Sequence, residues 1–323
     1  MGKKSNPVLS VVMNNYNAQD FIGEAIESIL SQSFTDFEFL ITDDGSTDAS
    51  VTIIESYAKK DKRINVFLRG KNPEVRCGRL VENTNAAFRE AKGKYIAILD
   101  SDDCALAERL KTQISFLEEH PEIYLVAGSY IRRDEQGEEL GRTSMPMSSE
   151  EVLEQLPKKS LIVHSSVCFR NTQEFFHREK LSRCNDYDFY LQILAAGKKI
   201  CVLSNFLVKY TVRSNSISSQ GFMQQKKSME LAKHFFQERI KKGKDAYEEL
   251  DDEKEIWSLK ESLVSYEKRV VKESFRDNKM NRVRKEIFHL WKKKHFSLWS
   301  LVYFGASFTP LKLLTRIRKH LWK

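Results

Sequence analysis

Three carboxylates lie within four consecutive residues at the end of an apolar run. The run is Tyr95–Leu99, and Asp100, Asp102 and Asp103 follow it. In an extended strand alternate side chains point to the same side, which would place Asp100 and Asp102 together. So much negative charge at one strand end is unfavourable unless a cation offsets it. Because carboxylate oxygens suit hard divalent ions, this turn predicts a metal site.

Amide and aromatic side chains follow an earlier β-rich run, residues 8–13. They are Asn14, Tyr16 and Asn17. A tyrosine can stack on a nucleotide base, and a neighbouring amide can hydrogen-bond the edge of that base. The same residues also suit a plain polar loop before a helix that begins near Asp20. The loop is therefore a candidate base-binding site, with a capping loop as the alternative.

Two consecutive aspartates, Asp43 and Asp44, end the next β-rich run. Gly45 permits a sharp turn, and the hydroxyl residues after it could cap the following helix. Capping does not require paired carboxylates at the strand end, so one aspartate is expected to bind a ligand. Asp44 is favoured over Asp43.

A further acidic pair, Asp186 and Asp188, opens a predicted helix in the second half of the chain. The helix dipole favours acidic residues in a first turn, and this effect alone would explain the pair. A carboxylate beside a substrate hydroxyl can also remove its proton as a general base. The motif is therefore either a stabilised helix start or the source of a catalytic base.

Strands and helices alternate between these motifs. Strands are expected at 8–13, 37–42, 64–68, 95–99, 123–129 and 199–203, and helices at 19–31, 48–60, 78–92, 107–119 and 186–196. The alternation predicts an α/β fold with a mostly parallel sheet and helices on both faces. Ligands of such open sheets bind at the carboxyl ends of the strands, where the polar motifs fall.

In order and spacing, the four motifs resemble those of the family 2 glycosyltransferases, inverting sugar-transfer enzymes of the Rossmann-like GT-A fold. The resemblance implies transfer of a sugar from a nucleotide diphosphate sugar, UDP-linked, with Mg²⁺ or Mn²⁺ as cofactor. In the DxD motif of the family, Asp102 would be the metal ligand and Asp100 would face the ribose. Asp186 would be the catalytic base, although Asn185 stands where Glu is usual.

The resemblance also implies how the substrates are held. The residues assigned to the donor nucleotide are Asn14, Tyr16, Asn17, Asp43, Asp44, Asp100 and Arg213. Asn14 replaces the usual proline of the base-binding element, and one of the paired aspartates would accept the N3 proton of uracil. His164 and Asp103 are assigned to the acceptor side.

Basic residues concentrate at the C-terminus. The net charge is +8, yet 279–323 alone hold twelve Lys or Arg and one acid, so the other 278 residues carry 41 basic and 44 acidic residues. An aromatic segment, 296–304, precedes a basic amphipathic pattern after Pro310. Such segments bind anionic membrane surfaces, each basic group contributing about 1 kcal/mol. The alternative is a helix packed on the catalytic domain.

These features predict a GT-A catalytic domain at 1–218, a helical extension at 219–295 and a basic membrane-associating tail at 296–323. The longest apolar run, Phe296–Phe308, is too short to span a bilayer. The first residues lack a signal-peptide pattern, and five cysteines without C-x-x-C spacing indicate reduced thiols. A cytoplasmic location, peripheral on the inner face of the cell membrane, is expected.

The predicted function is a metal-dependent, inverting hexosyltransferase that acts on a glycan or lipid-linked glycan in surface polysaccharide synthesis, with no nucleic-acid partner. The second hypothesis is a catalytically inactive GT-A scaffold that serves as a basic membrane or nucleic-acid adaptor. A dinucleotide-dependent oxidoreductase is disfavoured because no G-x-G-x-x-G motif follows the first strand.

Overall fold

The computed structural model describes residues 6–70, 79–181, 183–213, 222–249 and 298–308, together with 271, 280, 283, 284, 287 and 288. The chain divides into two compact units, Met1–Glu253 and Lys254–Lys323. The helix predicted after Pro310 lies outside the described residues.

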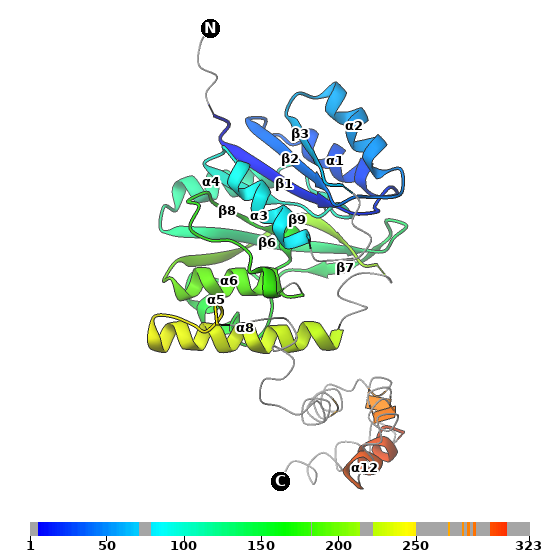
Figure 1. Ribbon diagram of the computed structural model, residues 1–323, viewed down its shortest axis with the longest axis vertical. Helices are drawn as coiled ribbons and strands as arrows, with labels where there is room; N and C mark the ends of the chain where they lie inside the picture. The colour runs from blue at the N-terminus through cyan, green and yellow to red at the C-terminus, as the bar shows by residue number, and fades with distance from the viewer. Residues whose placement is uncertain are drawn as a thin grey trace. The chain divides into compact units, whose positions relative to one another are not determined.

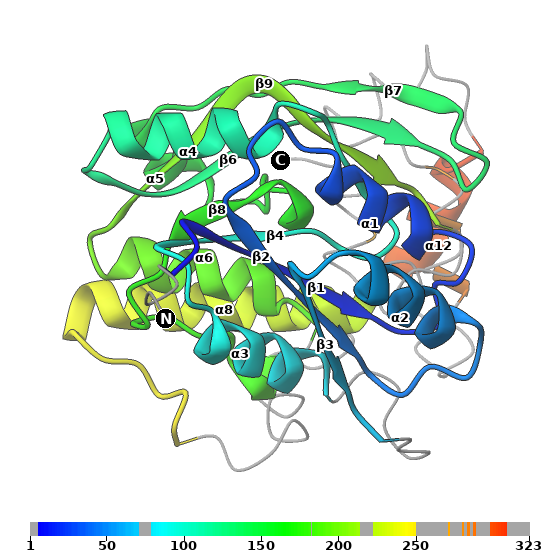
Figure 2. The same ribbon diagram turned by 90° about the horizontal axis from the view of Figure 1, so that it is seen from above.

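A nine-stranded mixed sheet forms the centre of the first unit (Figures 1 and 2). Its strands are β1 (Leu9–Asn15), β2 (Phe37–Asp43), β3 (Ile64–Leu68), β4 (Tyr95–Ile98), β5 (Cys104–Ala105), β6 (Ile123–Arg133), β7 (Glu139–Thr143), β8 (Cys168–Arg170) and β9 (Lys199–Thr211). Their order is β3-β2-β1-β4-β8-β6-β9-β5, with β7 paired to β6. β3, β2, β1 and β4 are parallel, β8 is antiparallel to β4 and β6, and β9 is parallel to β6. The predicted mostly parallel sheet is confirmed.

Helices cover both faces of the sheet (Figure 2). They are α1 (Ile22–Leu30), α2 (Ser50–Lys60), α3 (Leu80–Glu90), α4 (Arg109–Glu119), α5 (Ser149–Gln155), α6 (Asn185–Ala195) and α8 (Phe222–Lys242), with short 3-10 turns η1 (His164–Ser166) and η2 (Glu179–Leu181). Apolar residues of α1, α2 and α4 share one core with alternate side chains of β1, such as Val11 and Met13. On the opposite face Phe88 of α3 meets Phe189 of α6, with ring centroids 6.0 Å apart. Because β1 is buried on both faces, its sequence is a continuous apolar run.

The predicted elements of the first half are confirmed, whereas the second half differs in detail. β6 and β9 continue to Arg133 and Thr211, well beyond the predicted 129 and 203, because the two strands pair along almost their whole length. β5, β7 and α5 were not predicted. The two residues of β5 form a strand only because β9 lies beside them. The start of α5 did carry a signal, since Ser148 and Glu151 form a capping box.

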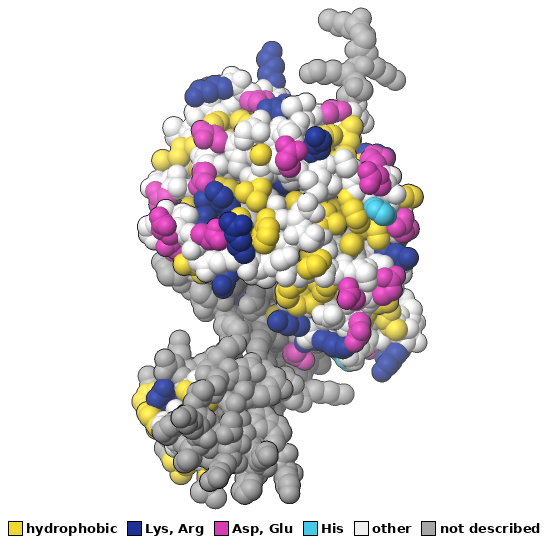
Figure 3. Space-filling model, turned by 180° about the vertical axis from the view of Figure 1, so that it is seen from behind, with side chains coloured by type: hydrophobic (Ala, Val, Ile, Leu, Met, Phe, Trp, Pro, Cys, Tyr) yellow, Lys and Arg dark blue, Asp and Glu magenta, His cyan; other side chains and the backbone are white. Residues whose placement is uncertain are grey.

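The first unit continues past the boundary that the sequence predicts after residue 218. It ends at Glu253, because α8 packs on α6 beneath the sheet (Figure 1). The helical extension predicted at 219–295 is therefore divided, with its first part belonging to the catalytic unit. On the face shown in Figure 3, acidic and basic side chains are mixed over this unit.

The second unit is described around α12 (Leu298–Ala306). Tyr303 is buried, whereas Leu301, Val302 and Phe308 are exposed. The Arg284 guanidinium lies 4.4 Å from the centroid of the Phe308 ring. Within the described residues, no helix is long and apolar enough to cross a membrane.

Gly93 permits a close backbone approach that places β4 beside β1. A Cβ atom at Gly93 would lie 2.4 Å from the backbone nitrogen of Ser10 and 2.5 Å from the carbonyl carbon of Leu9. The Gly93 N–H also donates to Ser10 Oγ over 2.9 Å. Neither strand can move aside without disturbing the pairing of β1 with β4.

Gly93→Ala should therefore lower the free energy of unfolding by about 2 kcal/mol, as overpacking of a close contact does. Urea denaturation measures the change. Gly70→Ala is the matched control, because a Cβ atom there meets nothing within 4 Å. Equal stability of the two variants would contradict the expectation.

Candidate active site

The polar motifs meet at one edge of the sheet. β1 lies between β2 and β4 and runs parallel to both, with Asn14 opposite Thr42 and Asn15 opposite Asp43. The loops after these strands therefore emerge side by side. This brings together the polar residues after β1, the aspartate pair after β2 and the acidic turn Asp100–Asp103 after β4.

Asp43 shapes the turn after β2. Its carboxylate accepts hydrogen bonds from Gly45 N at 3.0 Å, Ser46 N at 2.8 Å and Ser46 Oγ at 2.6 Å. Asn15, which the sequence did not single out, donates a fourth bond from Nδ2 over 2.7 Å. With only 1% of its surface exposed, Asp43 has its oxygens engaged inside the protein. Asp43 therefore has no free carboxylate oxygen for the contact with the donor nucleotide that was expected from the sequence.

Asp44 lies at the rim of the same turn. Its Oδ1 accepts from Asn83 Nδ2 at 3.0 Å and lies 3.2 Å from Arg79 Nε. That Arg79 atom forms an ion pair without hydrogen-bond geometry. Among the described residues, none forms a hydrogen bond or ion pair with the second oxygen of Asp44, which leaves that oxygen available to a ligand. Arg79 and Asn83 come from the start of α3, and Asn83 carried no signal in the sequence.

The three residues predicted to hold the base have different roles at the end of β1 and in the loop that follows it. Tyr16 is 46% exposed. Asn14 donates from Nδ2 to Thr84 Oγ1 over 2.6 Å, while its Oδ1 is buried without a partner in the described protein. Asn17 has a φ of 48°, and its Oδ1 accepts from Thr47 N at 2.8 Å. Asn17 thus joins two loops, and Tyr16 is the side chain free to stack on a ligand.

The acidic turn is held from two sides. Ser165 of η1 donates from Oγ to Asp100 Oδ2 over 3.0 Å and accepts from Asp100 N. The end of β9 supplies Thr211, whose N–H donates to Asp103 Oδ1 over 2.7 Å and whose hydroxyl donates to the Asp102 carbonyl. Arg213 Nη1 lies 3.3 Å from Asp102 Oδ2. Asp103 is only 1% exposed, and its carboxylate accepts a hydrogen bond from β9. It therefore does not reach an acceptor substrate, contrary to its assignment from the sequence.

The protein supplies its own cations to this turn. Arg109 is fully buried and donates from Nη2 to the Ile98 and Val167 carbonyls at 2.6 and 3.2 Å. Burial lowers the pKa of Arg109 to about 10, and the charges of Asp103 and Asp100 act in the opposite direction. Arg109 lies inside the protein and Arg213 at the surface, so the inference that the charge alone demands a metal ion does not hold.

Two carboxyl groups of the turn, those of Asp102 and Asp103, have raised pKa values. Burial raises the pKa of Asp102, and the charge of Asp100 raises it further, while Arg213 lowers it. Burial and the two neighbouring carboxylates raise the pKa of Asp103 well above its ordinary value. Asp103 Oδ2 is buried without a partner in the described residues. Those residues contain no group of three His, Cys, Asp or Glu arranged to hold a metal ion.

Asp186 lies in the first turn of α6. Among the described residues, none forms a hydrogen bond or ion pair with its half-buried carboxylate. Tyr190, one helical turn later, is fully buried and hydrogen-bonds His164 Nδ1 over 2.8 Å. Burial raises the pKa of Tyr190, and the charges of both Asp186 and Asp100 raise it further. The charges of Asp186 and Asp100 therefore both act on the Tyr190 hydroxyl, which hydrogen-bonds His164.

A buried neutral histidine supports the helix start. His177 Nδ1 lies 3.4 Å from Asn185 Nδ2, and its ring stacks on Phe189 with centroids 4.7 Å apart. The backbone of His177 exchanges two hydrogen bonds with the Asn85 side chain of α3. Burial lowers the pKa of His177 to about 3, with the charge of His164 adding to the effect. The uncharged amide of Asn185 is a suitable partner for the neutral His177 ring. His177 carried no signal in the sequence.

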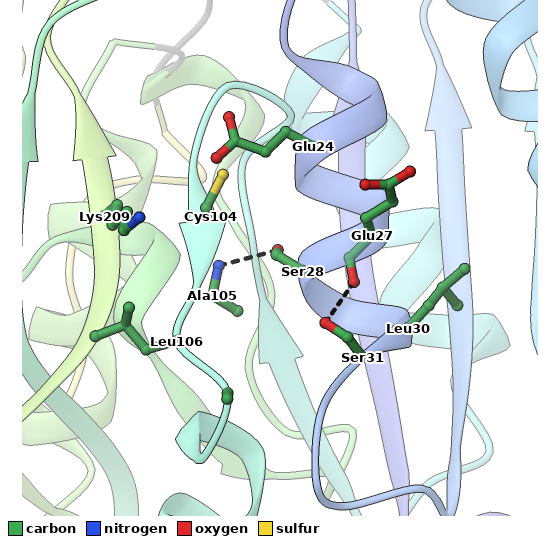
Figure 4. Close-up of a pocket in the computed structure, with 10 residues that line it drawn as sticks. Glu24, Glu27, Ser28, Leu30, Ser31, Cys104, Ala105, Leu106 and Lys209 are labelled. Carbon is green, nitrogen blue, oxygen red and sulfur yellow. Dashed lines mark hydrogen bonds between the residues drawn. The ribbon is translucent and has the colours of Figure 1, made fainter. Parts of the chain in front are cut away.

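A separate open groove of about 670 Å³ lies between α1, β5 and β9 (Figure 4). None of the predicted site residues lines it. At its edge Glu24 receives two hydrogen bonds from Arg133 Nη1, at 2.7 and 2.8 Å. Burial raises the pKa of the Cys104 thiol in its wall to about 12, so this thiol is unreactive. The groove is therefore distinct from the site at the strand ends.

The buried neutral His177 should make the protein less stable in acid. Its pKa is 6.5 when unfolded and about 3 when folded, so only the unfolded state gains a proton between these values. The free energy of unfolding then falls as pH drops below 6.5, by about 2 kcal/mol at pH 5 relative to pH 7.5. Urea denaturation across this range, with wild type and His177→Gln compared, measures the contribution. His234→Gln, an exposed histidine, is the control. Identical slopes for wild type and His177→Gln would contradict this expectation.

Comparison with known proteins identifies the family. Residues 10–179 match the model described as Glycosyl transferase family 2. An uncharacterized glycosyltransferase of Methanocaldococcus jannaschii is 35% identical over 225 residues, which cover 68% of this chain and 76% of that protein. TuaG of Bacillus subtilis, provisionally named a teichuronic acid biosynthesis glycosyltransferase, is 28% identical over 222 residues, covering 69% of this chain and 86% of that protein.

A solved structure of similar fold is TarS 1–349 of S. aureus in complex with UDP-GlcNAc. Its TM-score is 0.55 at 18% identity, and the match covers 93% of this chain and 90% of that one. The similarity confirms the predicted GT-A fold. Since the family model spans more than half of the sequence and includes the strand ends that carry the site, the chain belongs to glycosyl transferase family 2.

Proposed function

We propose that this glycosyltransferase moves a sugar from a UDP-linked donor to an acceptor hydroxyl with inversion, using Asp186 as the general base. The observation that carries the proposal is the half-buried Asp186 carboxylate, which has no hydrogen bond or ion pair to a described residue and whose charge, like that of Asp100, acts on the Tyr190 hydroxyl bonded to His164. A base there removes the acceptor proton while the anomeric carbon gains positive charge. Attack from the side opposite the leaving nucleotide then inverts the configuration.

The donor half of the site follows from the loops after β1 and β2. The exposed Tyr16 ring is available to stack on uracil, and Asp44 retains an oxygen for the base edge. Asp100 is held by Ser165 at the position proposed for the ribose. TarS, which shares the fold, was crystallised with UDP and with UDP-GlcNAc. This supports a UDP-sugar as the donor class.

Mg²⁺ or Mn²⁺ is the proposed cofactor, with Asp102 as its protein ligand. Mg²⁺ sites at substrate phosphates commonly use one or two carboxylates and several waters, so the lack of a three-residue cluster among the described residues is compatible with such an ion. Asp102 is partly exposed, and the neighbouring Asp103 Oδ2 has no partner in the described protein. The ion would offset charge on the departing diphosphate, and Arg213 could pair with the same group.

The proposed acceptor is a lipid-linked glycan of surface polysaccharide synthesis, reached at the inner face of the cell membrane. The provisional name of TuaG refers to one such polymer. In the second unit α12 exposes Leu301 and Val302, and the surrounding sequence is strongly basic. Apolar and basic residues together favour an anionic membrane surface.

The proposal predicts different losses for the two carboxylates. The rate of UDP release is measured with Mn²⁺ and a panel of UDP-sugars that includes UDP-GlcNAc. Asp186→Asn should lower this rate by a factor of about 10² or more, because a general base is lost. Its affinity for UDP should stay unchanged. Asp102→Asn should lose the dependence of UDP binding on Mn²⁺, measured by calorimetry. The exposed Asp36→Asn serves as the control.

Wild-type turnover in both aspartate variants would contradict the assigned roles. A wild-type chain that neither binds UDP nor turns over any nucleotide sugar would instead support the inactive-scaffold hypothesis. One observation favours that second hypothesis, since Arg213 lies where the cation would bind Asp102.

Membrane association predicts that the full chain sediments with vesicles that contain phosphatidylglycerol and stays in solution with phosphatidylcholine alone. Leu301→Asp combined with Val302→Asp should reduce the bound fraction several-fold, because two exposed apolar side chains are lost. Leu153→Asp, an equally exposed leucine of α5, should leave it unchanged. Equal binding of all three proteins would exclude a role for α12.

A further inference from the structure

A buried ionic cluster joins the start of α6 to the segment that contains α8. Arg178, just before η2, has a side chain only 6% exposed. Its Nη2 lies 2.5 Å from Asp245 Oδ2, and its Nε lies 3.6 Å from Asp188 Oδ2 on α6. Arg239 of α8 contacts the same Asp245 oxygen from Nε at 2.7 Å. The cluster therefore links residues that precede β9 in the sequence to residues that follow it.

Aromatic rings of the same segment enclose the arginine. The Arg178 guanidinium carbon lies 4.5 Å from the centroid of the Tyr247 ring and 5.4 Å from that of Phe235. The Tyr247 hydroxyl also accepts from the Lys180 N–H over 3.1 Å. Guanidinium groups bind favourably over aromatic faces when water is excluded. Residues 222–249, here called the α8 arm, thus supply the surroundings of a buried charge that belongs to the catalytic fold.

Because the α8 arm surrounds Arg178, it helps to position the segment that leads into α6. His177 is held by Asn85 of α3 on one side, and Arg178 by Asp245 of the α8 arm on the other. These two residues begin the short segment that leads into α6. The α8 arm therefore fixes where this helix starts.

The cluster also fixes the rotation of the first helical turn. Residues two apart on an α-helix point in nearly opposite directions, at 100° per residue. Asp188 points inward, where it is 1% exposed, lies near Arg178 and accepts from Gln192 Nε2 over 2.8 Å. Asp186 then points outward to the site. Anchoring Asp188 thereby sets the direction of the Asp186 carboxylate.

We propose that Asp245 and Arg239 of the α8 arm are positioning residues for Asp186, acting through Arg178 and Asp188. The family model ends at residue 179, before the α8 arm begins, so this contribution lies outside the matched region. The catalytic role of Asp186 is taken from the proposed function. The packing of the helix start by the α8 arm is independent of that role.

The test compares Asp245→Asn and Arg239→Gln with wild type in the full chain. Glu249→Gln, an exposed side chain at the end of the α8 arm, is the matched control. Hydrogen–deuterium exchange is measured on peptides that cover 183–191 and 95–103. UDP affinity with Mn²⁺ is measured by calorimetry, and the rate of UDP release from UDP-GlcNAc and related donors is followed separately.

Asp245→Asn should raise exchange in 183–191 several-fold and leave 95–103 unchanged. UDP affinity should stay within about twofold, because the donor half of the site does not touch the α8 arm, while the rate of UDP release falls about tenfold or more. Arg239→Gln removes only the outer partner and should show the same pattern more weakly.

Unchanged exchange in 183–191 for both variants would overturn the proposal, as would equal losses in both peptides and in UDP affinity, which would indicate general destabilisation. A wild-type chain without turnover on any donor would contradict the proposed function alone, because the exchange data still test the positioning.

Discussion

The arrangement of the site depends on the confinement of negative charge in the turn Asp100–Asp103. Asp103 is buried and Asp102 is partly exposed, and burial and the charges of neighbouring carboxylates raise the pKa values of both. Arg109 counters this charge from inside the protein and Arg213 from the surface. The turn thus has carboxylates and guanidinium groups of opposite charge close together, and the proposed binding of a cation and a diphosphate depends on this arrangement.

Each element around the turn also holds one of its groups in place. The 3-10 turn η1 fixes Asp100 through Ser165, and the end of β9 fixes Asp103 and the Asp102 carbonyl through Thr211. The same η1 turn contributes His164, which hydrogen-bonds Tyr190 on the helix that carries Asp186. The metal-binding and base-bearing halves of the proposed site are thus connected by a short series of hydrogen bonds. A displacement of α6 would therefore change the hydrogen bonds that position Asp100.

The sequence predicted more of the β1–β4 half than of the half that follows. β1, β2 and β4 are buried on both faces and read as apolar runs, so their positions and the polar residues at their ends could be identified. β5 forms only because it pairs with β9, and the second half of β9 pairs with β6, so neither carries a comparable pattern in the sequence. Asp43 and Asp44 show that tertiary structure also decides the roles of single residues. Only the folded turn reveals that Asp43 is fully hydrogen-bonded.

The sequence by itself determined the alternation of strands and helices, the residues at the carboxyl ends of the strands and the basic character of the C-terminus, because these are local properties of spacing and composition. Only the tertiary structure decided the partners of the buried charges. Arg109, Arg178 and His177 look like ordinary residues in the sequence. Their importance arises because folding removes them from water beside Asp103, Asp245 and Asn185, and electrostatic interactions strengthen as water is excluded.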